Sequence, residues 1–234
     1  MKPKKRKGPK KQARARRTGP RRFTVPLLIL ECDTAKLEPI SASLGKEMAE
    51  FLTKIGAQDS YTLVRAATKG QLQNDLAALV LSGKVYKTIW VIGHSSANGI
   101  QMTSDFFSPW PGFACWLRDF RPMTIVLTAC AAGQCWPAKS MFAGIETLHK
   151  LYGSPVKLTV EQARLIQAIV VGRLMELKVD ANARMLLKTV FSLCTGGVLF
   201  EYSRAEFRRL GPGEQAMWDL AGIGLGELLK GMRR

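Results

Sequence analysis

Short apolar runs alternate with amphipathic stretches along the chain as far as residue 153. Four runs are apolar enough for buried strands, at residues 23–32, 61–66, 87–94 and 123–130. Apolar residues recur at helical spacing over residues 37–56, 68–83, 110–120 and 137–153. This alternation of strand and helix predicts an α/β fold, a three-layer sandwich built around a mostly parallel sheet.

Beyond residue 153 the pattern is mainly helical. Amphipathic helices are predicted over residues 159–179 and 181–193, a late strand within residues 196–203, and further helix from Arg204 onward. No internal repeat divides the sequence. Residues 23–234 are therefore expected to form one domain with a helical C-terminal part.

The formal net charge of +17 is concentrated in the first 22 residues. Residues 1–22 hold 12 Lys and Arg and no acid, which leaves 23 basic against 18 acidic residues in the remainder. This segment has no aromatic or branched apolar side chain to bury, so it is predicted to be a disordered basic tail. Such a tail is typical of nucleic-acid binding and equally typical of a solubilising extension.

The five cysteines show no C-x-x-C pair, which favours reduced thiols in a cytoplasmic protein. The apolar run of residues 23–30 follows basic residues, as in a signal peptide, but Glu31 and Asp33 come next without a small-residue cleavage site. No apolar run reaches the roughly 20 residues of a membrane span. The spacing of histidine and cysteine predicts no metal site, and no cofactor is expected.

Two reactive side chains come at the ends of predicted strands. His94 ends the third strand and Cys130 the fourth. If these strands are neighbours, about 4.8 Å apart, both side chains lie at one edge of the sheet. A thiolate is a nucleophile, and an imidazole can take and return its proton. The alternative is that Cys130 is an ordinary packed thiol.

The local sequence around these residues resembles that of caspase-clan cysteine peptidases, especially bacterial caspase-like domains of the CHAT type. "TIWVIGHSS" places Gly93-His94 after one strand, and "TIVLTACAAG" places Ala129-Cys130 after the next, with Gly133 shortly beyond. The resemblance covers roughly residues 23–155. It implies a caspase-like fold, a protein substrate and an activating protein partner.

By this resemblance His94 is the base and Cys130 the nucleophile, and backbone N–H groups at Ser95 and Gly133 help to bind the oxyanion. Family members usually have glycine directly after the histidine, where this chain has Ser95. The family's second half is not recognisable in the sequence. An inactive relative therefore remains an alternative.

In this clan the end of the first strand often contributes to the pocket for the residue before the scissile bond. Asp33 stands there, and its carboxylate would favour a basic Arg or Lys side chain. Equally, Asp33 could cap the turn into the following helix. Residues 96–111 are expected to form a pocket wall or flap, with Asp105 and Trp110 as contacts.

A serine hydrolase is a weaker interpretation. "GHSSA" is one residue short of the G-x-S-x-G motif, with Ser95 as nucleophile and only His149 available as a downstream base. The prediction is therefore a cysteine endopeptidase with a His94/Cys130 dyad. The alternative is a non-catalytic caspase-like scaffold whose basic tail binds nucleic acid or another anionic partner.

Overall fold

The structure, a computed structural model, describes residues 26–32, 44–54, 58–154, 157–164, 166 and 200–207. In chain order the elements are β1 (Leu27–Glu31), α2 (Leu44–Lys54), the 3-10 helix η1 (Gln58–Ser60), β2 (Tyr61–Arg65), α3 (Lys69–Leu81), β3 (Thr88–Ile92), β4 (Ser95–Ser96), β5 (Gly99–Thr103), β6 (Phe106–Pro109), α4 (Trp110–Arg118), β7 (Thr124–Thr128), α5 (Cys135–Gly144), β8 (Lys150–Gly153), β9 (Phe200–Ser203) and α8 (Arg204–Phe207).

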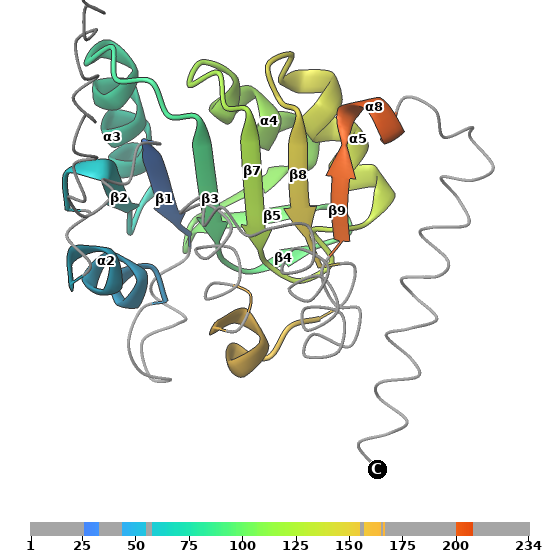
Figure 1. Cartoon of the computed structure of the whole chain (residues 1–234), viewed down its shortest axis with the longest axis horizontal. Helices are drawn as coiled ribbons and strands as arrows, with labels where there is room; N and C mark the ends of the chain where they lie inside the picture. The colour runs from blue at the N-terminus through green and yellow to red at the C-terminus, as the bar shows by residue number, and fades with distance from the viewer. Residues whose placement is uncertain are drawn as a thin grey trace, which may run out of the picture.

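The central sheet has six strands in the order β2-β1-β3-β7-β8-β9 (Figure 1). The first five are parallel, and β9 pairs antiparallel with β8. The expected α/β fold with a mostly parallel sheet is thus confirmed. The short strands β4, β5 and β6 form a separate antiparallel sheet.

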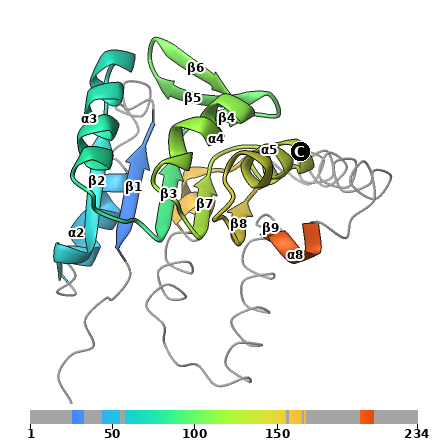
Figure 2. The same cartoon turned by 90° about the horizontal axis from the view of Figure 1, so that it is seen from above.

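Helices cover both faces of the central sheet (Figure 2). On one face α3, α4 and α5 pack on a core that includes Leu28 and Val91. On the other, α2 packs on a second core that includes Ile29 and Trp90. Because side chains alternate along a strand, neighbouring residues of β1 and β3 enter different cores. This arrangement explains why every residue of these two strands is buried.

The segment 137–153, expected to be one helix, is a helix followed by a strand. α5 ends at Gly144, and β8 begins at Lys150. Leu151 and Tyr152 are buried in opposite cores, which a strand allows because its side chains alternate. The apolar spacing of α5 continues into β8, so periodicity alone did not separate them.

The segment 96–111, expected to be a pocket wall or flap, forms β4 to β6 and the start of α4. Trp110 is fully buried, and its Nε1 donates to a carbonyl oxygen of β4 at 3.1 Å. The Asp105 carboxylate accepts from the Thr103 hydroxyl at 2.6 Å and from the Lys69 N–H at 3.1 Å. These hydrogen bonds lower the pKa of Asp105 and join the hairpin to the start of α3.

Several expectations fall outside the described residues. These are the basic tail at 1–22, the helix at 181–193, most of the helix at 159–179, the end of the chain after Phe207, and Asp33. The late strand is confirmed as β9. None of the helices in the described ranges is long and apolar enough to cross a membrane.

Glu31, at the end of β1, is a buried carboxylate bound by groups of β2 and α2. It forms an ion pair with Arg65 at 2.8 Å and accepts a hydrogen bond from the Gly45 N–H at 3.0 Å. Its side chain is fully buried. The Arg65 charge and the N-terminal turn of α2 therefore stabilise a carboxylate that burial alone would destabilise.

Replacing Glu31 with Gln is expected to lower the free energy of unfolding by about 3 kcal/mol, because Arg65 loses its counter-ion. Urea denaturation measures the change. Glu47→Gln is the matched control, since Glu47 pairs with Arg164 where both side chains are partly exposed. Its effect should stay below about 1 kcal/mol. Equal effects in the two variants would contradict the structural role of Glu31.

Candidate active site

The strands that carry His94 and Cys130 are neighbours, as the sequence interpretation required. β3 and β7 pair in parallel, with Ile92 opposite Thr128 at their carboxyl ends. The Gly93 N–H donates to the Thr128 carbonyl oxygen at 3.3 Å, so the pairing continues beyond the last strand residue. His94 and Cys130 each follow the Ile92–Thr128 pair by two positions. The register brings both to the same edge of the sheet, on strands about 4.8 Å apart.

The two residues have different surroundings. Cys130 is half-buried, and its Sγ accepts a hydrogen bond from the Leu158 N–H at 3.4 Å. His94 is exposed, and its ring makes no hydrogen bond with another described residue. The His94 carbonyl oxygen accepts from the Gln101 N–H at 2.9 Å. The backbone of the turn is thus fixed, while the imidazole is accessible for proton transfer.

Residues 157–164, which follow β8, contact both α2 and the loop after β7 that contains Cys130, called the cysteine loop below. Arg164 binds Glu47 of α2 through two hydrogen bonds, of 3.2 and 2.8 Å. This carboxylate raises the pKa of Arg164. The segment is therefore held at both ends, by Leu158 at the Cys130 thiol and by Arg164 at α2.

Ala131, directly after Cys130, has a left-handed backbone conformation, with a φ of 56°. This region costs a non-glycine residue roughly 1–2 kcal/mol, so surrounding contacts must impose it. Backbone strain of this kind clusters at functional sites. Nothing in the identity of an alanine signals it in the sequence.

Gly133 anchors the loop that contains Cys130. Its N–H donates to the Ser154 carbonyl oxygen at 2.7 Å, and its own carbonyl oxygen accepts from the Tyr202 hydroxyl. A Cβ added at this position would lie 2.1 Å from the Gly153 carbonyl oxygen. The N–H of Gly133 is thus used within the fold. In this structure the residue anchors the loop and does not offer the oxyanion donor that was expected of it.

Other backbone N–H groups are available at this edge. Within the described ranges, the N–H groups of Cys130, Ala131 and Ala132 have no hydrogen-bond acceptor. Across the site, His94 forms a hydrogen-bonded pair with β5, so Ser95 belongs to the next, non-hydrogen-bonded pair. The Ser95 N–H therefore points away from β5. The backbone N–H groups of Ser95, after β3, and of Cys130, after β7, are thus potential hydrogen-bond donors at this edge of the sheet.

The Ser95 hydroxyl donates to the carbonyl oxygen of Cys130, which joins the histidine turn to the cysteine loop. This hydroxyl is not a free nucleophile. His149, the base that a serine hydrolase would need, lies at the opposite edge: its backbone N–H donates to the Met123 carbonyl oxygen, just before the amino end of β7. Strands rise about 3.3 Å per residue, so a whole strand length separates Ser95 from His149. The geometry excludes that pair.

Gly93 is a glycine because two strand ends approach closely beside it. A Cβ added there would lie 2.8 Å from the Cys32 Cβ. The Cys32 N–H donates to the Ile92 carbonyl oxygen at 2.8 Å, so neither strand end can move aside freely. The glycine of the Gly-His turn therefore has a packing role that does not depend on catalysis.

Gly93→Ala is expected to lower the free energy of unfolding by about 2 kcal/mol, because the new methyl group overlaps Cys32. Cys32→Gly removes the Cys32 Cβ, which is the atom that the new methyl group overlaps. In a double-mutant cycle the cost of Gly93→Ala should fall by at least about 1 kcal/mol in the Cys32→Gly background. Urea denaturation of the four proteins gives the coupling. Strictly additive effects would contradict the assignment of the contact.

Two acidic residues, Glu31 and Asp33, lie at the end of the first strand, where Asp33 was expected to line a substrate pocket. Glu31 is committed to Arg65 and Gly45 and is not open to a substrate. Asp33, the residue on which the expected basic preference depends, lies outside the described residues. The preference for a basic substrate thus remains a prediction.

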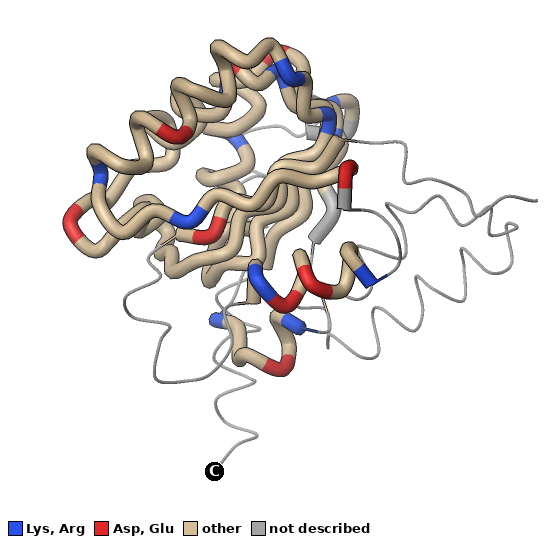
Figure 3. Tube along the Cα trace, turned by 90° about the vertical axis from the view of Figure 1, so that its left-hand side faces the viewer, with Lys and Arg blue, Asp and Glu red and all other residues tan. Residues whose placement is uncertain are grey.

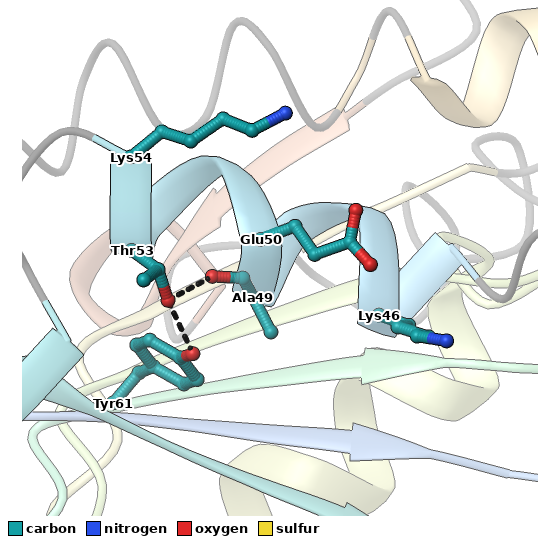
Figure 4. A pocket seen from close by; sticks show the side chains of 6 residues that line it. All are labelled: Lys46, Ala49, Glu50, Thr53, Lys54 and Tyr61. Carbon is teal, nitrogen blue, oxygen red and sulfur yellow. Dashed lines mark hydrogen bonds between the residues drawn. The ribbon is translucent and has the colours of Figure 1, made fainter.

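A shallow hollow lies between α2 and the start of β2 (Figure 4), and neither His94 nor Cys130 lines it. The Thr53 hydroxyl bonds to the Ala49 carbonyl oxygen and the Tyr61 hydroxyl, each at 2.9 Å. Lys46, Glu50 and Lys54 also line it. Its polar groups satisfy one another or face solvent, so no reactive grouping is formed there.

Comparison with known proteins adds no assignment: no protein-family model matches the chain, and no curated protein matches it. In the part of the chain that the structure describes, no three His, Cys, Asp or Glu side chains gather as a metal site would require. The functional argument therefore concerns the edge formed by the loops after β3 and β7.

Proposed function

We propose that the protein is a cysteine endopeptidase of the caspase type, with His94 and Cys130 as its catalytic dyad. The observation that carries the proposal is the shared register of β3 and β7, which gives the two residues equivalent places after neighbouring strands. The strained Ala131 supports it, as do the N–H groups beside Cys130, which bond to none of the residues that the structure describes.

In the proposed reaction His94 takes the proton of the Cys130 thiol, and the thiolate attacks the carbonyl carbon of the scissile peptide bond. Backbone N–H groups at Cys130 and Ser95 donate to the oxyanion that forms. His94 then protonates the leaving amine as the C–N bond breaks, which leaves a thioester. Water, deprotonated by His94, hydrolyses the thioester and restores the thiol.

We assign the substrate as a protein chain with Arg or Lys before the scissile bond, by charge pairing with Asp33. Reduced thiols fit a cytoplasmic location. The resemblance to caspase-like domains also implies an activating protein partner.

A second candidate function, a non-catalytic scaffold with a nucleic-acid-binding tail, is favoured by one observation. Residues 1–22 carry 12 of the 35 basic residues of the chain. In the described part, Lys and Arg are interspersed with Asp and Glu along α2 and α3 (Figure 3). Binding through the tail would weaken steeply with salt and would not depend on Cys130.

The peptidase proposal is tested by incubating the full chain with a mixture of unstructured peptides and sequencing the products by mass spectrometry. Cleavage should follow Arg or Lys and require Cys130. Cleavage with another preference would remove the role of Asp33 but retain the dyad. If neither the full chain alone nor a cell extract supplemented with it cleaves peptides in a Cys130-dependent way, the peptidase proposal is rejected.

A further inference from the structure

We propose that the Ser95 side chain is a positioning residue that holds the Cys130 loop in its reactive conformation. The inference rests on the proposed function for its catalytic meaning, but the contact itself is structural. The Ser95 hydroxyl donates to the Cys130 carbonyl oxygen. Ser95 is half-buried and stands one residue after His94, so a single hydroxyl couples the two halves of the dyad.

The hydrogen bond fixes the orientation of one peptide plane. The Cys130 carbonyl and the Ala131 N–H belong to the same planar group and point in opposite directions. When Ser95 holds the carbonyl oxygen, the Ala131 N–H is directed away from Ser95. This N–H makes no hydrogen bond with another described residue. The contact therefore determines where one potential oxyanion donor points.

The same peptide plane begins the strained part of the loop. Ala131 has a φ of 56°, which an alanine does not adopt without external constraint. Constraint comes from both sides: Ser95 holds the carbonyl before Ala131, and Ser154 and Tyr202 hold Gly133 after it. Without the Ser95 hydroxyl, the Cys130 carbonyl oxygen loses this hydrogen bond, while the loop keeps its bonds at the Cys130 thiol, at the Ala131 carbonyl oxygen and at Gly133. The 130–131 peptide plane is then less constrained and can rotate towards a conformation that releases the strain.

This role gives a reason for the departure from the family pattern. Where caspase-clan members usually have glycine after the histidine, a glycine would offer its N–H but no hydroxyl. In this chain the residue supplies both groups: its N–H points away from β5, and its hydroxyl binds the cysteine loop. Ser95 is thus more than a tolerated substitute for glycine.

The test compares Ser95→Ala, Ser95→Gly and Ser95→Thr with the wild-type full chain. Ser95→Thr keeps the hydroxyl. Ser96→Ala is the matched control, because it removes an exposed hydroxyl from the same hairpin. Among the described residues, the only hydrogen-bond partner of this hydroxyl is the Asn98 N–H, at 3.2 Å. Near-ultraviolet circular dichroism verifies that each variant is folded.

Two rates are measured at Cys130 by mass spectrometry: labelling by a peptidyl electrophile ending in Lys, and labelling by iodoacetamide. Ser95→Ala and Ser95→Gly should slow the peptidyl electrophile about 10-fold, the usual consequence of losing one positioning hydrogen bond. Iodoacetamide needs no oxyanion donor, so its rate should change less than about 2-fold. Ser95→Thr should restore most of the first rate, and Ser96→Ala should not alter it.

Amide hydrogen exchange over residues 130–134 separates this inference from the peptidase proposal. Faster exchange in Ser95→Ala, and not in Ser96→Ala, supports the positioning role even if the wild-type chain cleaves no peptide. Exchange and labelling rates equal to those of the wild type would overturn it, whatever the outcome for His94 and Cys130.

Discussion

Replacing Cys130 with alanine is expected to abolish peptide cleavage, with a loss on the order of 10⁴-fold or more in kcat/KM. The reason is that no other group in the proposed mechanism forms the covalent bond to the substrate. The variant should fold normally, since Cys130 is half-buried and alanine removes only the sulfur atom. Cleavage of a reporter peptide, followed by fluorescence, gives the measurement.

His94→Ala should lower kcat/KM by about 10²–10⁴-fold, the range that general acid–base catalysis contributes. Cys115→Ala is the control for the loss of a thiol, because Cys115 is an exposed free cysteine on α4. It should leave the rate unchanged. Retained activity in Cys130→Ala, or equal losses in the Cys115 and Cys130 variants, would contradict the assignment of the nucleophile.

Gly133→Ala is expected to destabilise the fold by about 3 kcal/mol, the upper end of what overpacking usually costs. The new Cβ would lie 2.1 Å from the Gly153 carbonyl oxygen. The Cβ is fixed by its bond to the backbone and the oxygen is itself a backbone atom, so neither can rotate away. Relieving the overlap would also pull the Gly133 N–H from the Ser154 carbonyl oxygen. Urea denaturation followed by tryptophan fluorescence measures the loss.

Gly70→Ala is the matched control. A Cβ added at Gly70 meets nothing within 4 Å, and the residue lies in α3. Alanine has the higher helix propensity, so this variant should be more stable by up to about 1 kcal/mol. If Gly133→Ala is as stable as wild type, the close contact between the cysteine loop and β8 is wrong.

The strands β1, β3 and β7 of the central sheet were predictable because nearly all of their residues are buried, on both faces. A continuous apolar run that ends at Gly93 or at another small residue predicts such a strand. Once β3 and β7 are paired, the ends of their two runs lie opposite each other, which gives the register. β8 was not predicted because the apolar residues before it keep helical spacing. What identifies it as a strand is that Leu151 and Tyr152 are buried in the two cores on opposite faces of the sheet. Which core a side chain enters depends on the tertiary structure and cannot be seen in the local sequence.

The placement of His94 and Cys130 at one edge of the sheet was predictable in part. Residues at the ends of neighbouring parallel strands meet at one edge, and β3 and β7 are such neighbours. The contacts that shape the loop were not predictable, because they join residues distant in sequence: Ser95 reaches Cys130, and Tyr202 reaches Gly133. The sequence likewise predicts an oxyanion donor at the Gly133 N–H, whereas this N–H donates to the Ser154 carbonyl oxygen.

The most direct test of the dyad is site-selective labelling of the wild-type full chain with a peptidyl electrophile that ends in Arg or Lys. Mass spectrometry then locates the label in the wild type and in His94→Ala. The proposed function predicts a label concentrated on Cys130 and lost in His94→Ala. A label spread over all five cysteines, and indifferent to His94, would show Cys130 to be an ordinary thiol and contradict the proposed dyad.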